Sequence, residues 1–184
     1  MTTVALAGRR IDAPDAAVRF PLARVDAVAD ALGDYFRRHA VTHLVSSAAC
    51  GADLVALRVA ATAGVARRTV VLPFDVATFR RTSVTDRPGA WGALYDRIVA
   101  EVAGEGGLVL LGLESAAPGA YDTATERILD VAGTAAGVDD AGAVRACLVW
   151  EGATRGVGDH SLALADGARR RGWPVDEVLT RAPG

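Results

Sequence analysis

The stretch with the clearest chemical pattern lies near the C-terminal end, where an apolar run is followed by glycines and then by a segment rich in alanine and arginine. Residues 146–150 read ACLVW, and Gly152, Gly156 and Gly158 follow. This order predicts a strand, a glycine loop and a helix N-terminus. Glycines let the backbone approach a ligand closely, and the first N–H groups of a helix lack partners and carry partial positive charge. The stretch therefore predicts a site for an anion such as a phosphate.

Four side chains next to this loop could also contact a ligand or take part in catalysis. Trp150 either stacks on a base or fills the core, and Asp159 is either a ligand contact or an N-cap. Asp159, His160 and Ser161 are the residue types of a catalytic triad, but consecutive positions cannot form that geometry among themselves. His160 therefore remains a candidate to hydrogen-bond a ligand oxygen or to cap the helix.

Upstream segments repeat the pattern of a short apolar run followed by a turn. Such runs lie at residues 4–7, around residues 44–45 and at residues 69–72. Each predicts a buried strand that ends before a ligand-facing loop. Together with the C-terminal stretch, these loops give the following candidate ligand-binding residues: Gly8, Arg9, Arg10, Asp12, Ala49, Cys50, Gly51, Asp53, Pro73, Phe74, Trp150, Gly152, Gly156, Gly158, Asp159, His160 and Ser161.

Asp53 and Cys50, which follow the apolar run around residues 44–45, each allow two interpretations. Asp53 falls in the first turn of the following helix, where it either stabilises the helix dipole or accepts a hydrogen bond from a ligand hydroxyl or amine. Cys50 precedes the same helix and is either a nucleophile with a lowered pKa or, as we favour, a small buried thiol that lets the turn pack.

The alternation of apolar runs with helical periodicity predicts the architecture that positions these loops. Further strands are expected at 108–113, 146–150 and 174–179. Apolar residues at helical spacing predict helices from near residue 22 and over 54–61, 91–102 and 121–132, the last with Tyr121 and Ile128 facing inward. We therefore expect one α/β domain over residues 1–184, with three layers and a mainly parallel sheet of five or six strands. Ligands bind outside the carboxyl ends of such strands.

Composition excludes several classes of function. The chain has 184 residues and a net charge of -2, so it has no electrostatic footprint for nucleic acid. No apolar run approaches the ~20 residues that span a bilayer, and the N-terminus lacks the charge order of a signal peptide, so we expect a cytoplasmic protein without membrane contacts. The two cysteines and three histidines show no metal-ligand spacing, and neither a metal nor a cofactor is expected.

The sequence contains no lysine, asparagine or glutamine. A phosphate-loop lysine and a Schiff-base lysine are therefore excluded. Any polar recognition must come from the backbone or from arginine, acidic, hydroxyl, aromatic or histidine side chains.

Several stretches, taken together, resemble one family. They read AGRRIDAPDAAVRFP, SSAACGADL, VVLPFDVATFRRTSV, YDTATERILDVA and CLVWEGATRGVGDHS. They are similar to SLOG-type domains, which are Rossmann-like nucleotide-ligand sensors related to the cytokinin-activating phosphoribohydrolases. The resemblance covers nearly the whole chain. It implies a Rossmann-like fold, a nucleotide-like ligand, a role in signalling or defence with a separately encoded effector protein, and a homo-oligomer, expected to be a dimer.

Two motifs depart from that family pattern. Gly8, Arg9 and Arg10 stand where Gly-His-Arg is expected, and the Gly-Gly-Thr position after the fifth strand reads Gly158, Asp159 and His160. The acidic residue would repel a phosphate at that helix start.

Our main interpretation is a binding domain for a nucleotide or a nucleotide-derived molecule, with Arg9 and Arg10 as cationic contacts. An alternative is a nucleotide N-glycoside hydrolase, which needs a carboxylate near the anomeric carbon and an arginine on the phosphate. The candidate catalytic residues are Asp12, Asp122 and Glu126. A third interpretation is a non-catalytic scaffold that acts through oligomer contacts.

Overall fold

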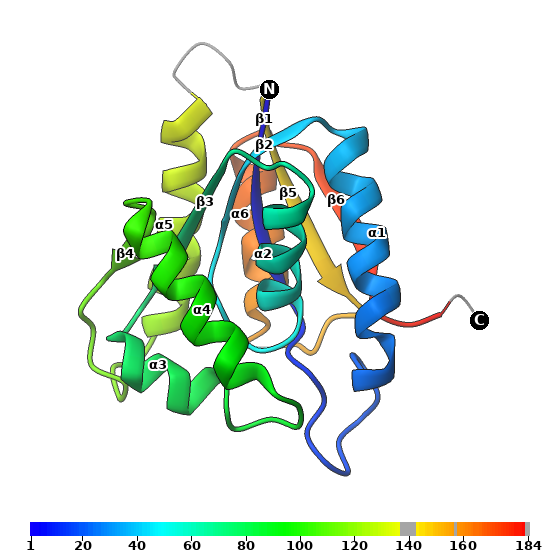
Figure 1. The fold of residues 1–184 in the computed structure, drawn as a ribbon, viewed down its shortest axis with the longest axis vertical. Coiled ribbons are helices and arrows are strands. Elements are labelled where there is room, and N and C mark those ends of the chain that lie inside the picture. Colours follow the sequence, from blue (N-terminus) through cyan, green and yellow to red (C-terminus); the bar gives the residue numbers. More distant parts are fainter. Residues whose placement is uncertain (137–142, 157, 183–184) are drawn as a thin grey trace.

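One parallel sheet forms the centre of the molecule (Figure 1). The structure, a computed structural model, describes residues 1–136, 143–156 and 158–182. Six strands lie in the order β4-β3-β2-β1-β5-β6, and every neighbouring pair is parallel. Their bounds are β1 Thr2–Gly8, β2 Val41–Ser46, β3 Arg67–Leu72, β4 Leu108–Leu110, β5 Val144–Trp150 and β6 Val175–Leu179. The prediction of an α/β, mainly parallel sheet with a Rossmann-like arrangement is confirmed.

Helices cover both faces of this sheet (Figure 1). They are α1 Val25–Arg38, α2 Ala52–Thr62, α3 Val76–Ser83, α4 Trp91–Gly104, α5 Ala120–Ala136 and α6 His160–Arg170, with a short 3-10 turn at Leu22–Arg24. Side chains alternate along β1, so Val4 and Leu6 join the core under α1, α2 and α4, while Ala5 joins the core under α5 and α6. None of the described helices is long and apolar enough to cross a membrane.

The order of the strands defines a switch point. From β1 the chain steps outward through β2 and β3 to β4, and α5 then returns it to β5, which pairs with the other side of β1. The loops after β1 and β5 therefore diverge to opposite faces of the sheet. In open sheets of this kind a crevice forms at that point, outside the carboxyl ends of the strands.

Two glycines let the elements converge at the switch point. A Cβ on Gly8 would lie 2.4 Å from the Ala52 Cβ and 2.5 Å from the carbonyl oxygen of Val149. Gly51 has a φ of 101°, and a Cβ there would lie 2.7 Å from the Arg9 carbonyl oxygen. Both positions require glycine because the neighbouring backbone leaves no room for a side chain.

Three details differ from the sequence-based expectations. The fourth strand ends at Leu110 rather than at residue 113, because Gly112 adopts a φ of 66° and interrupts the extended backbone. The first regular helix begins at Val25, after the 3-10 turn. Tyr121, which we expected to face the core, is 37% exposed because it lies in the first turn of α5, where the helix reaches the carboxyl edge of the sheet.

Candidate ligand-binding site

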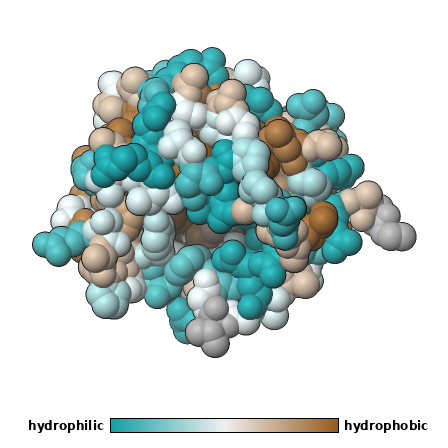
Figure 2. Space-filling model, turned by 90° about the horizontal axis from the view of Figure 1, so that it is seen from below, coloured by the Kyte–Doolittle hydropathy of each residue, from teal (hydrophilic) through white to brown (hydrophobic). Residues whose placement is uncertain are grey.

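A cavity of about 580 Å³ lies at the carboxyl edge of the sheet, next to the switch point. Figure 2 looks onto this edge and shows a hollow near its middle, surrounded by hydrophilic residues. The loop after β1, the start of α2, α3, the first turns of α5 and the segment before α6 all contribute to the lining. This volume falls within the range of about 300–1,000 Å³ that small-molecule sites occupy.

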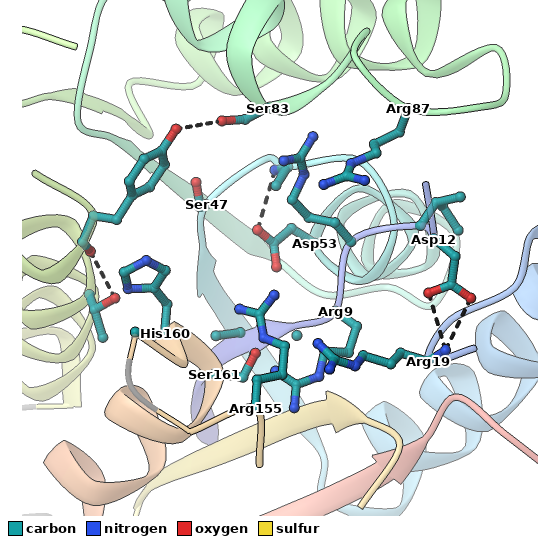
Figure 3. A pocket seen from close by; sticks show the side chains of 18 of the residues that line it. Arg9, Asp12, Arg19, Ser47, Asp53, Ser83, Arg87, Arg155, His160 and Ser161 are labelled. Atoms are coloured by element: carbon teal, nitrogen blue, oxygen red, sulfur yellow. Dashed lines mark hydrogen bonds between the residues drawn. The ribbon is translucent and has the colours of Figure 1, made fainter. Parts of the chain in front are cut away.

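Arginines dominate the charged lining of the cavity. Five arginines line it, against two aspartates, Asp12 and Asp53. The arginines are Arg9, Arg10, Arg19, Arg87 and Arg155, and Figure 3 labels all of them except Arg10. Arg10 and Arg87 both lie next to Asp86, and the Arg19 Nε is 3.4 Å from Glu151 Oε1. The lining is therefore rich in N–H donors suited to an anion.

Arg155 is the arginine of this set with the fewest partners. Within the described residues its side chain forms no ion pair. Burial and the nearby charges of Arg9 and Arg19 lower its pKa, despite the opposing influence of Asp159 and Glu151. An anion placed in the cavity would offset this crowding of like charges.

Arg9, in contrast, is engaged by the protein itself. Its side chain is 2% exposed, and its Nε donates to Glu151 Oε2 over 2.5 Å. Its two Nη atoms donate to Asp159 Oδ1 and Oδ2 over 2.7 and 3.0 Å. Nη2 also donates to the Ala153 carbonyl oxygen over 2.6 Å, and the guanidinium lies 5.7 Å from the ring centre of Trp150. Arg9 thus links the loop after β1 to the loop after β5.

Asp159 closes the N-terminus of α6 to an external anion. Its carboxylate caps the helix by accepting from the Leu162 N–H, and it also accepts from the Arg155 N–H over 2.9 Å. Burial raises the pKa of this carboxyl, but the hydrogen bonds from Arg9 and from the Arg155 backbone outweigh that effect and hold the pKa at about 2. The N-cap interpretation of Asp159 therefore agrees with its geometry, and a phosphate has no place at this helix start.

Asp53 occupies the first turn of α2 and is almost as buried as Asp159. Its Oδ2 accepts from the Ala49 N–H over 3.3 Å, and no described residue donates to its Oδ1. Burial raises the pKa of Asp53 to about 7, although the Ala49 N–H and the charge of Arg10 act in the opposite direction. The carboxyl points into the cavity in Figure 3.

Aromatic and aliphatic side chains form another wall of the cavity. Phe79, Tyr121, Ala124 and Ile128 contribute to it. The Tyr121 hydroxyl hydrogen-bonds the Ser83 hydroxyl over 2.9 Å, and Phe74 packs edge-on against the Tyr121 ring with centroids 5.5 Å apart. This wall combines apolar area with fixed hydroxyl groups, which suits the flat face of a heteroaromatic ring.

The three catalytic candidates lie in different environments. Asp12 lines the cavity, but its carboxylate accepts from the N–H groups of Arg19 and Phe20 and so shapes the loop after β1. Asp122 lies 3.0 Å from His160 Nδ1, and both side chains are well exposed. Glu126 is outside the cavity, where it pairs with Arg170 and Arg171.

The remaining candidates divide into two groups. The structure brings to the cavity Gly8, Arg9, Arg10, Ala49, Asp53, Gly158, His160 and Ser161. It does not place in the lining Cys50, Gly51, Pro73, Phe74, Trp150, Gly152, Gly156 or Asp159. Cys50 is fully buried and its pKa is raised by that burial, so the thiol stays neutral and packs as a small apolar group.

The cavity also contains residues that were not among the sequence-based candidates. The polar ones are Arg19, Ser47, Ser83, Arg87, Tyr121, Thr125 and Arg155. Arg19 and Arg155 belong to loops that were already expected to face the ligand, so their loop position was an available signal. Arg87 lies between α3 and α4, and no local pattern marks it.

No protein-family model matches this chain, and a search of the curated proteins also gave no match. The fold is of the Rossmann-like kind, with six parallel strands and a switch point between β1 and β5. The functional argument therefore depends on the geometry of the cavity.

Proposed function

We propose that this protein binds a nucleotide or a nucleotide-derived, phosphorylated small molecule in the cavity at the switch point. The observation that carries the proposal is an arginine-rich cavity of about 580 Å³ at the position where parallel sheets bind ligands. The phosphate would contact arginine side chains, above all Arg155 and Arg19, since Asp159 occupies the start of α6. Arg9 contributes indirectly, by neutralising Asp159.

The aromatic and aliphatic part of the lining supports the nucleotide part of the proposal. Tyr121, which is 37% exposed, offers an aromatic surface for a base, and the largely buried Phe79 and Ile128 also contribute to the lining. Ser83 and Thr125 add hydroxyl groups. Cationic and apolar groups in one cavity match a molecule that carries a phosphate and a heteroaromatic ring.

The relation to SLOG-type sensors is part of this proposal. Two of the stretches that carry the resemblance lie beside the cavity. The start of α2 lies in SSAACGADL, and the start of α6 lies in CLVWEGATRGVGDHS. A signalling or defence role, a separately encoded effector and a dimer follow from that relation and are proposed with it.

Binding is favoured over N-glycoside hydrolysis by the state of the three candidate carboxylates. Asp12 is engaged by backbone N–H groups, Asp122 by His160, and Glu126 by arginines outside the cavity. None of these three presents a free carboxylate to the cavity, which hydrolysis at an anomeric carbon would require.

A thermal-shift and calorimetric screen of nucleoside mono-, di- and cyclic phosphates tests the proposal. A specific ligand at about 100 times its Kd adds about 2.7 kcal/mol, which for a chain of this size raises Tm by roughly 5–10 °C. Arg155→Ala should weaken binding of any such nucleotide about tenfold or more, because it removes a charged contact.

The matched control is Arg97→Ala, since Arg97 is exposed on α4 and does not line the cavity. This variant should bind as the wild type does. The proposal is overturned if no nucleotide stabilises the wild-type protein, or if Arg155→Ala binds as tightly as Arg97→Ala.

A further inference from the structure

Asp53 is a buried carboxyl group with an unused acceptor atom. The residue is 7% exposed, and among the described residues Oδ1 has no hydrogen-bond partner. Oδ2 accepts a single hydrogen bond, from the Ala49 N–H over 3.3 Å. Leaving a buried polar atom without a partner is unfavourable, and protein interiors rarely contain one without a reason.

Helix stabilisation alone does not account for this arrangement. The N-cap of α2 is Gly51, and no side chain caps that helix end. A carboxylate that capped the helix would accept from one of its free N–H groups, as Asp159 does at α6 by accepting from the Leu162 N–H. Asp53 instead directs its carboxyl toward the cavity (Figure 3).

The position of Asp53 relative to the other lining groups limits what can approach it. In the view of Figure 3 its carboxyl lies between Arg155 on one side and Ser83, at the aromatic wall, on the other. A phosphate would be repelled by a carboxylate at this place. The part of a nucleotide that connects phosphate to base is the sugar, and its hydroxyl groups are hydrogen-bond donors.

We infer that Asp53 is the specificity-determining residue of the cavity, and that its free carboxyl oxygen accepts a hydrogen bond from a sugar hydroxyl of the bound nucleotide. This inference rests on the proposed function. It narrows the ligand class to ribonucleotides and ribonucleotide-derived molecules with at least one free ribose hydroxyl. It also assigns the start of α2 to the sugar, whereas a glycine-containing loop at a helix N-terminus usually receives phosphate.

The test compares ribonucleoside 5′-monophosphates with their 2′,3′-dideoxy analogues by calorimetry. The wild type should bind the ribonucleotide at least about tenfold more tightly, because a hydrogen bond to the buried carboxyl oxygen is lost in the analogue. In Asp53→Ala, whose side chain has no acceptor, the two should bind with equal affinity. Asp34→Ala, at an exposed position on α1 outside the cavity, should retain the wild-type preference.

The possible failures are distinguishable. If the wild type binds both nucleotides equally, or if Asp53→Ala retains the preference for ribose, the role of Asp53 is refuted while nucleotide binding stands. If neither nucleotide binds, the proposed function fails and the inference fails with it. Should Asp53→Ala not fold, Asp53→Val, whose side chain also lacks an acceptor, gives the same comparison.

Discussion

Two aspartates at the starts of two helices are held in opposite ways: Asp53 lines the cavity, and Asp159 lies beside it, between Gly158 and His160 of the lining. Asp159 at α6 accepts from both Nη atoms of Arg9 and from two backbone N–H groups, and its pKa is held at about 2. Asp53 at α2 accepts from one N–H group, and burial raises its pKa to about 7. The first carboxylate is satisfied by the protein, whereas the second has an unused acceptor.

This difference separates structural from ligand-facing chemistry. Residue type and burial are nearly the same for the two carboxyl groups, so neither distinguishes the roles, although Asp159 is an N-cap and Asp53 lies two residues after one. What differs is a counter-charge from a distant part of the chain: Arg9 reaches Asp159, while Asp53 has only the charge of Arg10 at longer range. A buried charge with a partner stabilises local structure, and one without a partner is available to a ligand.

Removing Arg9, the counter-charge of Asp159, should have the largest effect on the stability of the protein. Arg9→Ala leaves the buried carboxylates of Asp159 and Glu151 without their arginine. We expect the free energy of unfolding to fall by about 3–5 kcal/mol, measured by chemical denaturation at pH 7. Arg97→Ala, at an exposed site on α4, should change it by less than about 0.5 kcal/mol. A loss for Arg9→Ala as small as that of the control would show that the pair at α6 is not structural.

The variant Asp53→Asn should become more stable relative to the wild type as the pH rises. A carboxyl whose pKa is raised to about 7 on folding stabilises the protein below its ordinary value near 3.8, and this contribution is lost as the pH rises toward 7. The variant should therefore gain roughly 2–3 kcal/mol relative to the wild type between pH 5 and pH 8, and should level off above that. Denaturation curves at each pH measure the gain. A variant whose stability relative to the wild type does not change with pH would mean that Asp53 titrates normally.

Acid should reveal the contribution of Asp159. Its pKa is lowered to about 2 on folding, so it stabilises the protein above pH 4, and that contribution disappears as the pH falls through 2. The pH-dependent part of the gap between the wild type and Asp159→Asn should be about 2 kcal/mol at pH 7 and should shrink between pH 4 and pH 2. If the gap stayed constant over that range, the two aspartates would not differ in the way described here.

Much of the fold was predictable because its signals are local. Apolar runs placed all six strands, and helical periodicity placed α1, α2, α4 and α5, since each pattern depends on neighbouring residues. The location of Glu126 outside the cavity could also have been predicted from its spacing along the helix. It lies two residues after Ala124, which lines the cavity, and therefore on the far side of α5.

The candidate site was predictable only in part because its decisive contacts are distant in sequence. Asp159 was recognisable as a possible N-cap, but its pairing with Arg9 joins residues 150 positions apart. Nothing in the sequence of the glycine loop indicates that Arg9 is already paired with acidic side chains of the protein. Arg87 enters the cavity from the segment between α3 and α4, which carries no motif.

The placement of β1 between β2 and β5 has a consequence for biosynthesis. A ribosome releases residues 2–110, with four of the strands, well before β5 begins at Val144. Until then one edge of β1 has unpaired N–H and C=O groups, which other chains can pair with. Arg9 likewise has no ion-pair partner until Glu151 and Asp159 have been synthesised, and we expect premature termination before residue 144 to yield an aggregating product.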